Sequence, residues 1–237
     1  MYKVLLWDID GTILDFKASE KNAIRACFKH FSIGECTDEM IARYSEINDK
    51  YWKKLERGEL TKPEVLRGRF AEFFSSEGID FDRIDDFNGE YQVRLGDKVF
   101  FFDNSYELLC DLRGKLKQYA VTNGTYIAQT KKLANSGLDK IFDGVFISDK
   151  IGAEKPTLEF FRHVFDNIEK VALDEILIIG DSLTSDIKGA NNALIPCCYY
   201  TQGKPFENTT DLRIDHVISD LNEIYTILGI TPTYKEK

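Results

Sequence analysis

Two carboxylates stand two residues apart near the start of the chain, just after an apolar run. The run Lys3–Trp7 leads into Asp8 and Asp10, and Gly11-Thr12 follows them. Two aspartates this close repel each other and resist ionisation unless a cation or a shared proton relieves them. Gly11 permits a tight turn. The backbone N–H groups of this turn and the hydroxyl of Thr12 are hydrogen-bond donors. This segment predicts a site where a metal bridges an oxyanion to the carboxylates.

Further polar groups follow later apolar runs or lie near their ends. They are Thr122-Asn123-Gly124, Lys155-Pro156, and Gly180-Asp181-Ser182 together with Asp186. In a doubly wound sheet the carboxyl ends of the strands face one crevice. We therefore expect these side chains to converge on Asp8 and Asp10.

The elements that must position these residues alternate between short strands and helices from Asn104 onward. Strands are expected near Gln118–Val121, Gly144–Ile147, Glu175–Ile179, Pro196–Tyr200 and His216–Ile218, with helical spacing over Tyr126–Ser136, Leu158–Asn167 and Ser185–Asn192. This alternation implies right-handed crossovers and a parallel sheet covered on both faces. The strand Lys3–Trp7 belongs to the same sheet.

A block of amphipathic helices separates the first strand from the others, from about Phe16 to Leu95. Within it, Thr61 and Glu64 form a capping-box pattern with Pro63 in the first turn, which predicts a helix through Phe74. We therefore predict an α/β fold, a doubly wound parallel sheet formed by residues 1–15 and 97–237, with an all-helical domain inserted at residues 16–96. Hinges are expected near residues 15–16 and 97–104.

Composition limits the partners and the compartment. The 237 residues include 31 basic and 40 acidic ones, a net charge of −9, which argues against a nucleic-acid polymer or an anionic membrane as a partner. The five cysteines show no metal-ligand spacing, and their odd number excludes a fully paired disulfide framework. With no recognisable secretion signal or membrane-spanning run, we expect a cytoplasmic protein, a monomer or a weak homo-oligomer.

In this order, the motifs resemble those of the haloacid dehalogenase-like (HAD) superfamily of phosphohydrolases. The matching positions are the DxDGT motif at Asp8–Thr12, the strand-terminal Thr122, Lys155, and Gly180-Asp181 with Asp186. The resemblance also covers the helical cap after the first strand. It implies a Rossmann-like core, a Mg²⁺ cofactor and hydrolysis of a small phosphomonoester.

The resemblance also implies roles for these residues. Asp8 resembles the nucleophile that forms an aspartyl-phosphate, and Asp10 the general acid and base, whose backbone carbonyl also faces the metal. Asp181 and Asp186 complete the metal site, and which of them lies nearer the ion stays open. Hard oxygen ligands suit Mg²⁺. Phosphate-binding and catalytic roles fall on Thr122 and Lys155, with further phosphate contacts from Asp8, Gly11 and Asn123.

The cap segment over residues 47–70 resembles the bacterial pyrimidine 5′-nucleotidases of the YjjG type, which implies a nucleoside monophosphate substrate. Trp52 or Tyr51 is expected to stack on the base, and Asn48 or Arg69 to bind its polar edge. Each of these residues also suits an ordinary packed or solvated position on a helix.

Several alternatives remain open at this stage. Taken singly, each motif also fits an ordinary turn or helix cap, and it is their order that favours an active site. The same site would suit a phosphatase of phosphoglycolate or a sugar phosphate, or a phosphomutase of the β-phosphoglucomutase kind. A non-catalytic binding protein would be expected to lack Asp8 or Asp10. Dehalogenation is disfavoured because that chemistry does not use a magnesium site.

Overall fold

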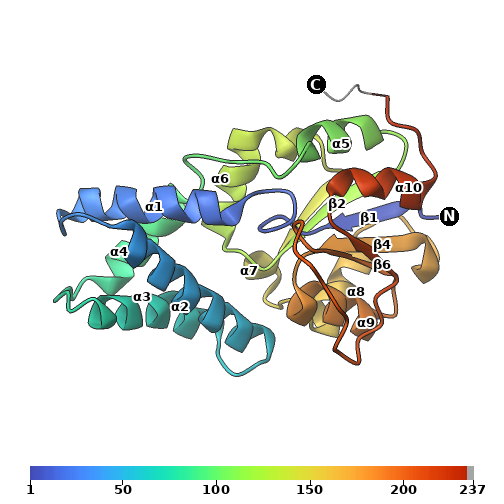
Figure 1. Cartoon of the computed structure of the whole chain (residues 1–237). Coiled ribbons are helices and arrows are strands. Elements are labelled where there is room, and N and C mark those ends of the chain that lie inside the picture. The colour runs from blue at the N-terminus through green and yellow to red at the C-terminus, as the bar shows by residue number, and fades with distance from the viewer. Residues whose placement is uncertain (234–237) are drawn as a thin grey trace. The chain divides into compact units, whose positions relative to one another are not determined.

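The computed structural model describes residues 1–233 and forms two compact units. The first, the core unit, comprises residues 1–15, 100–126 and those from 136 onward. The second, the helical unit, comprises residues 16–99 and 127–135. Figure 1 traces both along the chain.

The core unit is built on one six-stranded sheet of parallel strands in the order β3-β2-β1-β4-β5-β6. The strands are β1 (Val4–Trp7), β2 (Lys117–Thr122), β3 (Gly144–Ile147), β4 (Ile176–Gly180), β5 (Cys197–Tyr200) and β6 (His216–Ile218). In the centre of the sheet, Leu6 pairs with Tyr119 on one side and Ile178 on the other. The predicted parallel, doubly wound sheet is confirmed.

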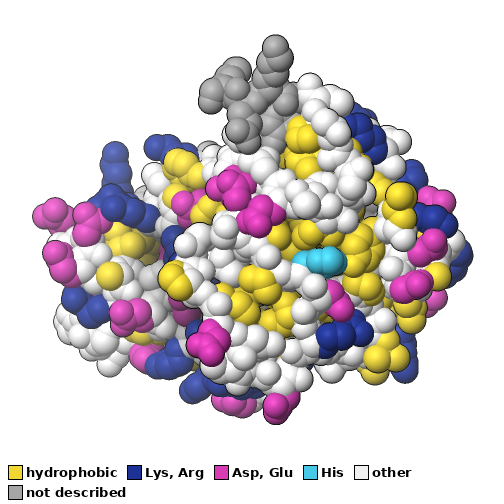
Figure 2. Space-filling view, turned by 45° about the vertical axis from the view of Figure 1, so that its right-hand side comes forward, with side chains coloured by type: hydrophobic (Ala, Val, Ile, Leu, Met, Phe, Trp, Pro, Cys, Tyr) yellow, Lys and Arg dark blue, Asp and Glu magenta, His cyan; other side chains and the backbone are white. Residues whose placement is uncertain are grey.

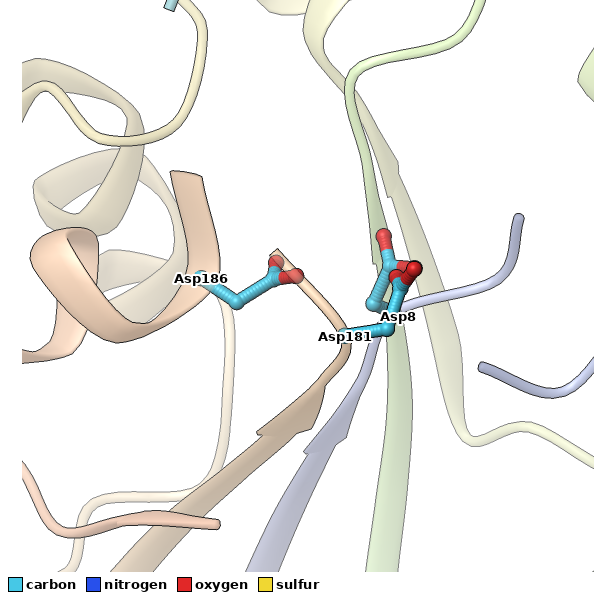
Figure 3. Close-up of side chains that lie close together, drawn as sticks. All are labelled: Asp8, Asp181 and Asp186. Atoms are coloured by element: carbon cyan, nitrogen blue, oxygen red, sulfur yellow. The ribbon is translucent and has the colours of Figure 1, made fainter. Parts of the chain in front are cut away.

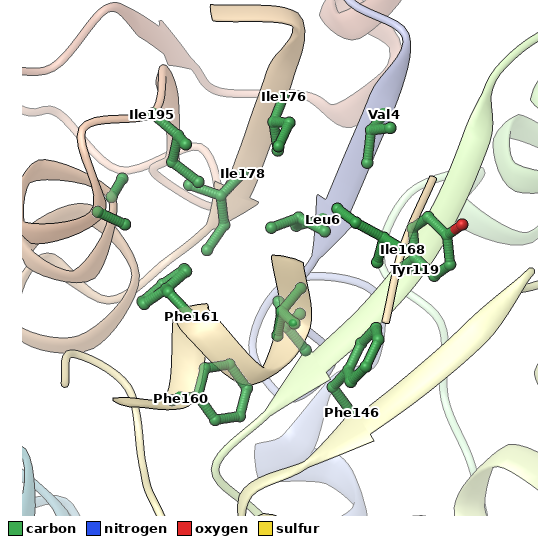
Figure 4. Packing of buried hydrophobic residues seen from close by; sticks show 14 of the residues in the cluster. Val4, Leu6, Tyr119, Phe146, Phe160, Phe161, Ile168, Ile176, Ile178 and Ile195 are labelled. Atoms are coloured by element: carbon green, nitrogen blue, oxygen red, sulfur yellow. The ribbon is translucent and has the colours of Figure 1, made fainter. Parts of the chain in front are cut away.

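Both faces of this sheet are covered, as Figure 1 shows for α5 and α10 on one side and α8 and α9 on the other. The helices are α5 (Ser105–Leu112), α6 (Tyr126–Ser136), α7 (Ser148–Ile151), α8 (Leu158–Asp166), α9 (Lys188–Ala193) and α10 (Ile224–Leu228). Val4 and Leu6 pack with Phe160 and Phe161 of α8 (Figure 4). Leu5 and Trp7, which alternate with them, are equally buried, as expected for a central parallel strand.

The expected elements match the observed ones with small shifts. β4 begins at Ile176 and β5 at Cys197, one residue later than expected in each case. The predicted helix at residues 185–192 starts earlier, with a π-helical turn at Leu183–Ile187 that continues into α9. Asp186 lies in this wider turn. A π-helical turn cannot be predicted from a periodicity of 3.6 residues per turn.

The helical unit contains α1 (Phe16–Phe31), α2 (Asp38–Glu56), α3 (Lys62–Ser76) and α4 (Ile84–Arg94). Its core is aromatic: Phe70 packs between Tyr44, at a ring separation of 5.0 Å, and Phe87, at 4.9 Å. The predicted capping box starts α3, since Thr61 N donates to the Glu64 carboxylate over 2.7 Å. The predicted helical insertion is confirmed.

The helical unit differs in extent from the expected block 16–96. It also includes residues 97–99 and most of α6, residues 127–135. The reason is local bonding: Lys131 donates to Val93 O over 3.0 Å, Asn135 donates to Gly96 O over 2.7 Å, and Ala128 joins the aromatic core.

Where the chain leaves β1 and where it returns, two segments of the core unit pair with each other. Asp15 N donates to Phe100 O over 2.9 Å, and Leu14 forms an antiparallel bridge with Phe101. The helical insertion thus begins and ends at one paired junction.

Acidic and basic side chains are interspersed on the face drawn in Figure 2, where apolar side chains also gather beside a histidine. Within residues 1–233, none of the helices combines the length and the apolar character needed to cross a bilayer.

Candidate active site

Asp8 lies directly after β1 at the carboxyl edge of the sheet. Its N–H donates to Ile179 O over 2.9 Å, so the residue is still held by strand pairing, and its side chain is 10% exposed. Beyond it, Ile9 O accepts from Leu14 N over 2.8 Å, which closes a tight loop. Gly11 in this loop has φ of 100°, and a Cβ there would collide with the Asp181 carboxylate. The loop therefore requires glycine.

Lys155 is buried against Asp8. Its ammonium group donates to Asp8 Oδ1 over 2.8 Å, to Asp186 Oδ1 over 2.6 Å and to Val121 O over 2.8 Å. These bonds use all three of its protons. Burial favours the neutral amine, but Asp186 and Asp8 outweigh it, so the pKa of Lys155 is raised and the group stays cationic.

Asn123 holds Lys155 in place through the backbone. Its side-chain amide donates to Lys155 O over 2.9 Å and accepts from Lys155 N over 2.8 Å. Lys155 was expected near the exit of β3, but the short helix α7 intervenes, so this two-point contact is what ties the lysine loop to the end of β2. The sequence prediction gave Asn123 only a phosphate contact and missed this positioning contact.

Thr122 ends β2 and is 1% exposed. Its Oγ1 accepts from Gly124 N over 3.1 Å, which stabilises the turn that follows. Within residues 1–233 the hydroxyl proton has no protein acceptor, so it is available to a bound anion.

Three carboxylates, from Asp8, Asp181 and Asp186, form the centre of the site. Each has an oxygen within 4.8 Å of the others, and Figure 3 shows them converging from β1, from the end of β4 and from the helical turn after it. Thr12 links two of them, since its Oγ1 lies 3.1 Å from Asp8 Oδ2 and 3.4 Å from Asp181 Oδ1.

The two later aspartates differ in their hydrogen bonds. Asp186 accepts from Lys155 at Oδ1 and from Ser182 N at Oδ2, over 2.6 and 3.1 Å. Asp181 accepts at Oδ2 from Gln202 Nε2 over 3.0 Å, whereas its Oδ1 has the long, 3.4 Å contact with Thr12. Asp181 is therefore the more open of the two to a further cation.

This buried cluster contains more negative than positive groups. Burial raises the pKa of Asp8 to about 7, and the pKa of Asp181 also rises because of burial and the neighbouring Asp8 and Asp186. When ionised, the three carboxylates and the one ammonium group of Lys155 sum to −2. A divalent cation with oxygen ligands would cancel that charge, so this donor set fits Mg²⁺.

Asp10 lies on the same loop, two residues beyond Asp8, and is partly exposed. Its side chain is not part of the three-carboxylate cluster, although its charge contributes to the raised pKa of Asp8. The Asp10 side chain therefore lies near the three-carboxylate cluster without being part of it.

The three cap residues proposed for specificity contact one another inside the helical unit. Asn48 Oδ1 accepts from Trp52 Nε1 over 3.1 Å and from Arg69 over 2.8 Å, and Asn48 donates to Glu20 over 2.9 Å. Asn48 and Arg69 are each 1% exposed, whereas Trp52 is partly exposed. Of the three, only Trp52 presents surface to a ligand in this structure.

Besides the positioning contact of Asn123, one residue of the site was missed from the sequence. The Thr12 hydroxyl was expected as a donor in the turn after β1, whereas Gln202, after β5, was not considered at all. Gln202 follows a strand of the predicted sheet at its carboxyl end, and that position was the available signal.

The fold and the acid cluster define a hydrolase of one known family. The model of haloacid dehalogenase-like hydrolases matches residues 2–193, and the chain belongs to that family. The resemblance predicted from the motifs is confirmed.

Among individual proteins, the chain is 36% identical over 233 residues to the HAD-hydrolase YfnB of Bacillus subtilis, covering 98% of this chain and 97% of that protein. A crystal structure of YfnB bound to magnesium matches with a TM-score of 0.90 over 97% of this chain and 99% of that one, at 35% identity. The pyrimidine 5′-nucleotidase PynA of Streptococcus pneumoniae is 35% identical over 84% of each chain.

Proposed function

We propose that this protein is a magnesium-dependent phosphomonoester hydrolase that acts through an aspartyl-phosphate on Asp8, with a nucleoside 5′-monophosphate, a pyrimidine nucleotide above all, as substrate. The observation that carries the proposal is the buried Asp8 carboxylate, paired with Lys155 and facing Asp181 and Asp186. The similarity to PynA across 84% of the chain supports the nucleotide substrate.

The reaction divides into two displacements at phosphorus. An Asp8 carboxylate oxygen attacks phosphorus while the bond to the leaving oxygen breaks, and Asp10 gives that oxygen its proton. Asp10, now ionised, takes a proton from water, whose oxygen attacks the phosphorus of the aspartyl-phosphate. The Asp8–phosphorus bond then breaks, inorganic phosphate leaves, and both aspartates return to their starting states.

The carboxylates of Asp8, Asp181 and Asp186, together with the backbone carbonyl of Asp10, would hold the metal. A bound Mg²⁺ would supply positive charge beside the phosphoryl oxygens and reduce their repulsion from the carboxylates. We propose Asp181 as the nearer ligand, because both oxygens of Asp186 already accept from Lys155 and Ser182. Asp186 then supports the site by holding Lys155.

The phosphate is held by groups that lie around Asp8. Lys155 neutralises both Asp8 and the incoming anion, Thr122 donates its hydroxyl proton, and the N–H group of Asn123 provides a backbone donor. The expected contact from Gly11 is not kept, because its N–H already donates to Leu14 O over 2.9 Å. Asn123 also fixes Lys155 through its two backbone contacts. Positioning and charge compensation of this kind account for most of the catalysis of phosphoryl transfer.

In this proposal the helical unit selects the substrate. Trp52 is the residue that presents a partly exposed aromatic surface for a base, while Asn48 and Arg69 act by fixing Trp52 through the buried network. Glyceraldehyde 3-phosphate phosphatases are also related, at 30% identity for the Methanocaldococcus jannaschii protein, but over only 54% of this chain. A small sugar or triose phosphate is therefore the second candidate.

The proposed oligomeric state, partners and compartment follow from the composition of the chain. The protein acts as a monomer or a weak homo-oligomer on a small molecule, without a nucleic-acid polymer or a membrane as partner, in keeping with its net charge of −9. Its five cysteines are all free thiols, which suits the reducing cytoplasm.

The decisive experiment compares kcat/KM, with Mg²⁺ present, for pyrimidine and purine 5′-monophosphates, phosphoglycolate, sugar phosphates and glyceraldehyde 3-phosphate. We expect the highest values for pyrimidine nucleotides, and no phosphate release by Asp8→Asn with any of them. A preference of tenfold or more for a sugar or triose phosphate would replace the nucleotide assignment. Full activity of a folded Asp8→Asn variant would remove the nucleophile.

A further inference from the structure

Gln202 lies two residues after β5 and connects two parts of the candidate active site. Its Nε2 donates to Gly11 O over 2.8 Å and to Asp181 Oδ2 over 3.0 Å. Gly11 belongs to the loop after β1, and Asp181 follows β4. One amide group thus holds the loop that follows Asp8 and an acidic residue of the cluster at a fixed separation.

The orientation of this amide is determined by its surroundings. Its Oε1 accepts from the ammonium group of Lys204 over 2.8 Å, while the two acceptors, a backbone carbonyl and a carboxylate, lie on the Nε2 side. A flipped amide would place its oxygen against both acceptors and its NH₂ group against the ammonium. Gln202 therefore acts as a donor toward Asp181.

The backbone at Gln202 is one that glutamine seldom adopts. Thr201 O accepts from Lys204 N over 3.1 Å, which closes a β-turn whose central residues, Gln202 and Gly203, have φ of 55° and 71°. Glycine, asparagine and aspartate are the residues favoured where both central positions are left-handed. A glutamine at this position costs backbone energy, and its longer side chain is what reaches Asp181.

The contact restricts Asp181 from one side. Gly11 lies so close to the Asp181 carboxylate that a Cβ would collide with it, and Gln202 binds its Oδ2. The other oxygen, Oδ1, has the long, 3.4 Å contact with Thr12 and belongs to a residue of the three-carboxylate cluster. The carboxylate is thus fixed with one oxygen bound to the protein and one open.

We infer that Gln202 is a positioning residue for the metal site: it fixes Asp181 for Mg²⁺ binding, and a turn-adapted residue in its place would weaken that binding. This inference rests on the proposed function, because it assumes that Asp181 is a metal ligand. Residues that orient ligands from outside the coordination shell typically change metal affinity by about 10- to 100-fold.

The test measures the Kd for Mg²⁺ directly by isothermal titration calorimetry, together with the melting temperature of the metal-free protein. Gln202→Met keeps the side-chain length and removes the amide. Gln202→Asn and Gln202→Gly suit the left-handed turn better, but neither reaches Asp181. We expect all three to raise the Kd about tenfold or more, while the metal-free melting temperatures of the Asn and Gly variants stay equal to or above that of the wild type.

Leu194→Gly is the matched control, since Leu194 is exposed, lies after α9 and has φ of 59°. It relieves the same backbone strain and should leave the Kd unchanged. If Gln202→Met and Gln202→Gly bind Mg²⁺ with a Kd within twofold of the wild type, the inference about Gln202 is wrong, while the proposed function stands. Absence of Mg²⁺ binding by the wild type would overturn both the metal site of the proposed function and the inference that depends on it.

Discussion

Lys155 Nζ lies 2.8 Å from Asp8 Oδ1, although the two residues are 147 positions apart in the chain. The lysine side chain is 1% exposed, so the carboxylate is its partner in a region that water hardly reaches. A buried cation of this kind does two things at once. It keeps Asp8 from being an isolated buried charge, and it offers positive charge where the phosphate of a substrate would bind.

Replacing Lys155 with methionine should therefore affect both stability and turnover. Removing one partner of a buried ion pair commonly costs about 3–5 kcal/mol, because the remaining charge is left uncompensated. We expect a loss of that size in the free energy of unfolding by urea, and a loss of phosphatase activity of at least about 100-fold, since the phosphate loses its charge partner. Lys21→Met removes a solvent-exposed ion pair with Asp38 and should cost no more than about 1 kcal/mol. Equal effects of the two variants would contradict this assignment.

Asp181→Asn and Asp186→Asn form a matched pair, because each removes one negative charge from the same cluster. Asp181 has the more open oxygen, whereas Asp186 is bound by Lys155 and Ser182. We expect Asp181→Asn to raise the Kd for Mg²⁺ by at least tenfold more than Asp186→Asn does, measured by calorimetry. The opposite ranking would make Asp186 the nearer ligand.

The raised pKa of Asp8, about 7 because of burial, makes the stability of the metal-free protein depend on pH. The unfolded carboxyl titrates near 3.8, so between that pH and 7 the folded state binds the proton more tightly. The contribution of Asp8 to stability is therefore present at low pH and is lost as the pH rises through 7. With a chelator present, we compare the free energy of unfolding of Asp8→Asn with that of the wild type. The difference, variant minus wild type, should increase from pH 5 to pH 8. A constant difference across that range would show that Asp8 does not titrate there.

Within the cap, Arg69 and Trp52 should behave differently. Arg69 is buried and donates to Asn48 and Asn88 over 2.8 and 3.1 Å, so Arg69→Met removes a buried cation and one donor from each of two acceptors that keep their bonds from Trp52 and Gln92. We expect it to lower stability by about 2–4 kcal/mol, measured by urea denaturation. Trp52→Ala removes a partly exposed ring, and we expect it chiefly to raise KM for pyrimidine nucleotides. An unchanged KM in Trp52→Ala would exclude stacking on the base.

Local sequence patterns were sufficient to predict the sheet and most of the residues of the candidate site. The run Ile176–Ile179 predicts a buried strand from composition alone, and Thr61 with Glu64 marks the start of α3. Asp8 and Asp181 follow strands of one sheet and Thr122 ends another of its strands, and parallel topology brings such positions to one edge. Convergence of these side chains could therefore be expected before any coordinates.

Contacts that depend on long-range packing could not be predicted in the same way. Gln202 reaches Gly11 across 191 positions, and no motif or periodicity marks it. Asn48 and Arg69 occupy helix positions whose residue types suit solvent as well as a buried network, and only the packing of α2 against α3 decides between them. The extent of the helical unit had the same cause, since hydrogen bonds from α6 join residues 127–135 to it.

The hydrogen bond between Asp15 and Phe100 also bears on how such a protein can be remodelled. Since the two ends of the insertion already meet, a bridge of a few glycines could replace residues 16–99 at a small loop-closure cost. The strand order would be untouched by whatever is spliced between those ends. The junction makes residues 16–99 a segment that another insertion can replace, provided that the new one also covers Ala128 of α6, which packs in the aromatic core of the helical unit.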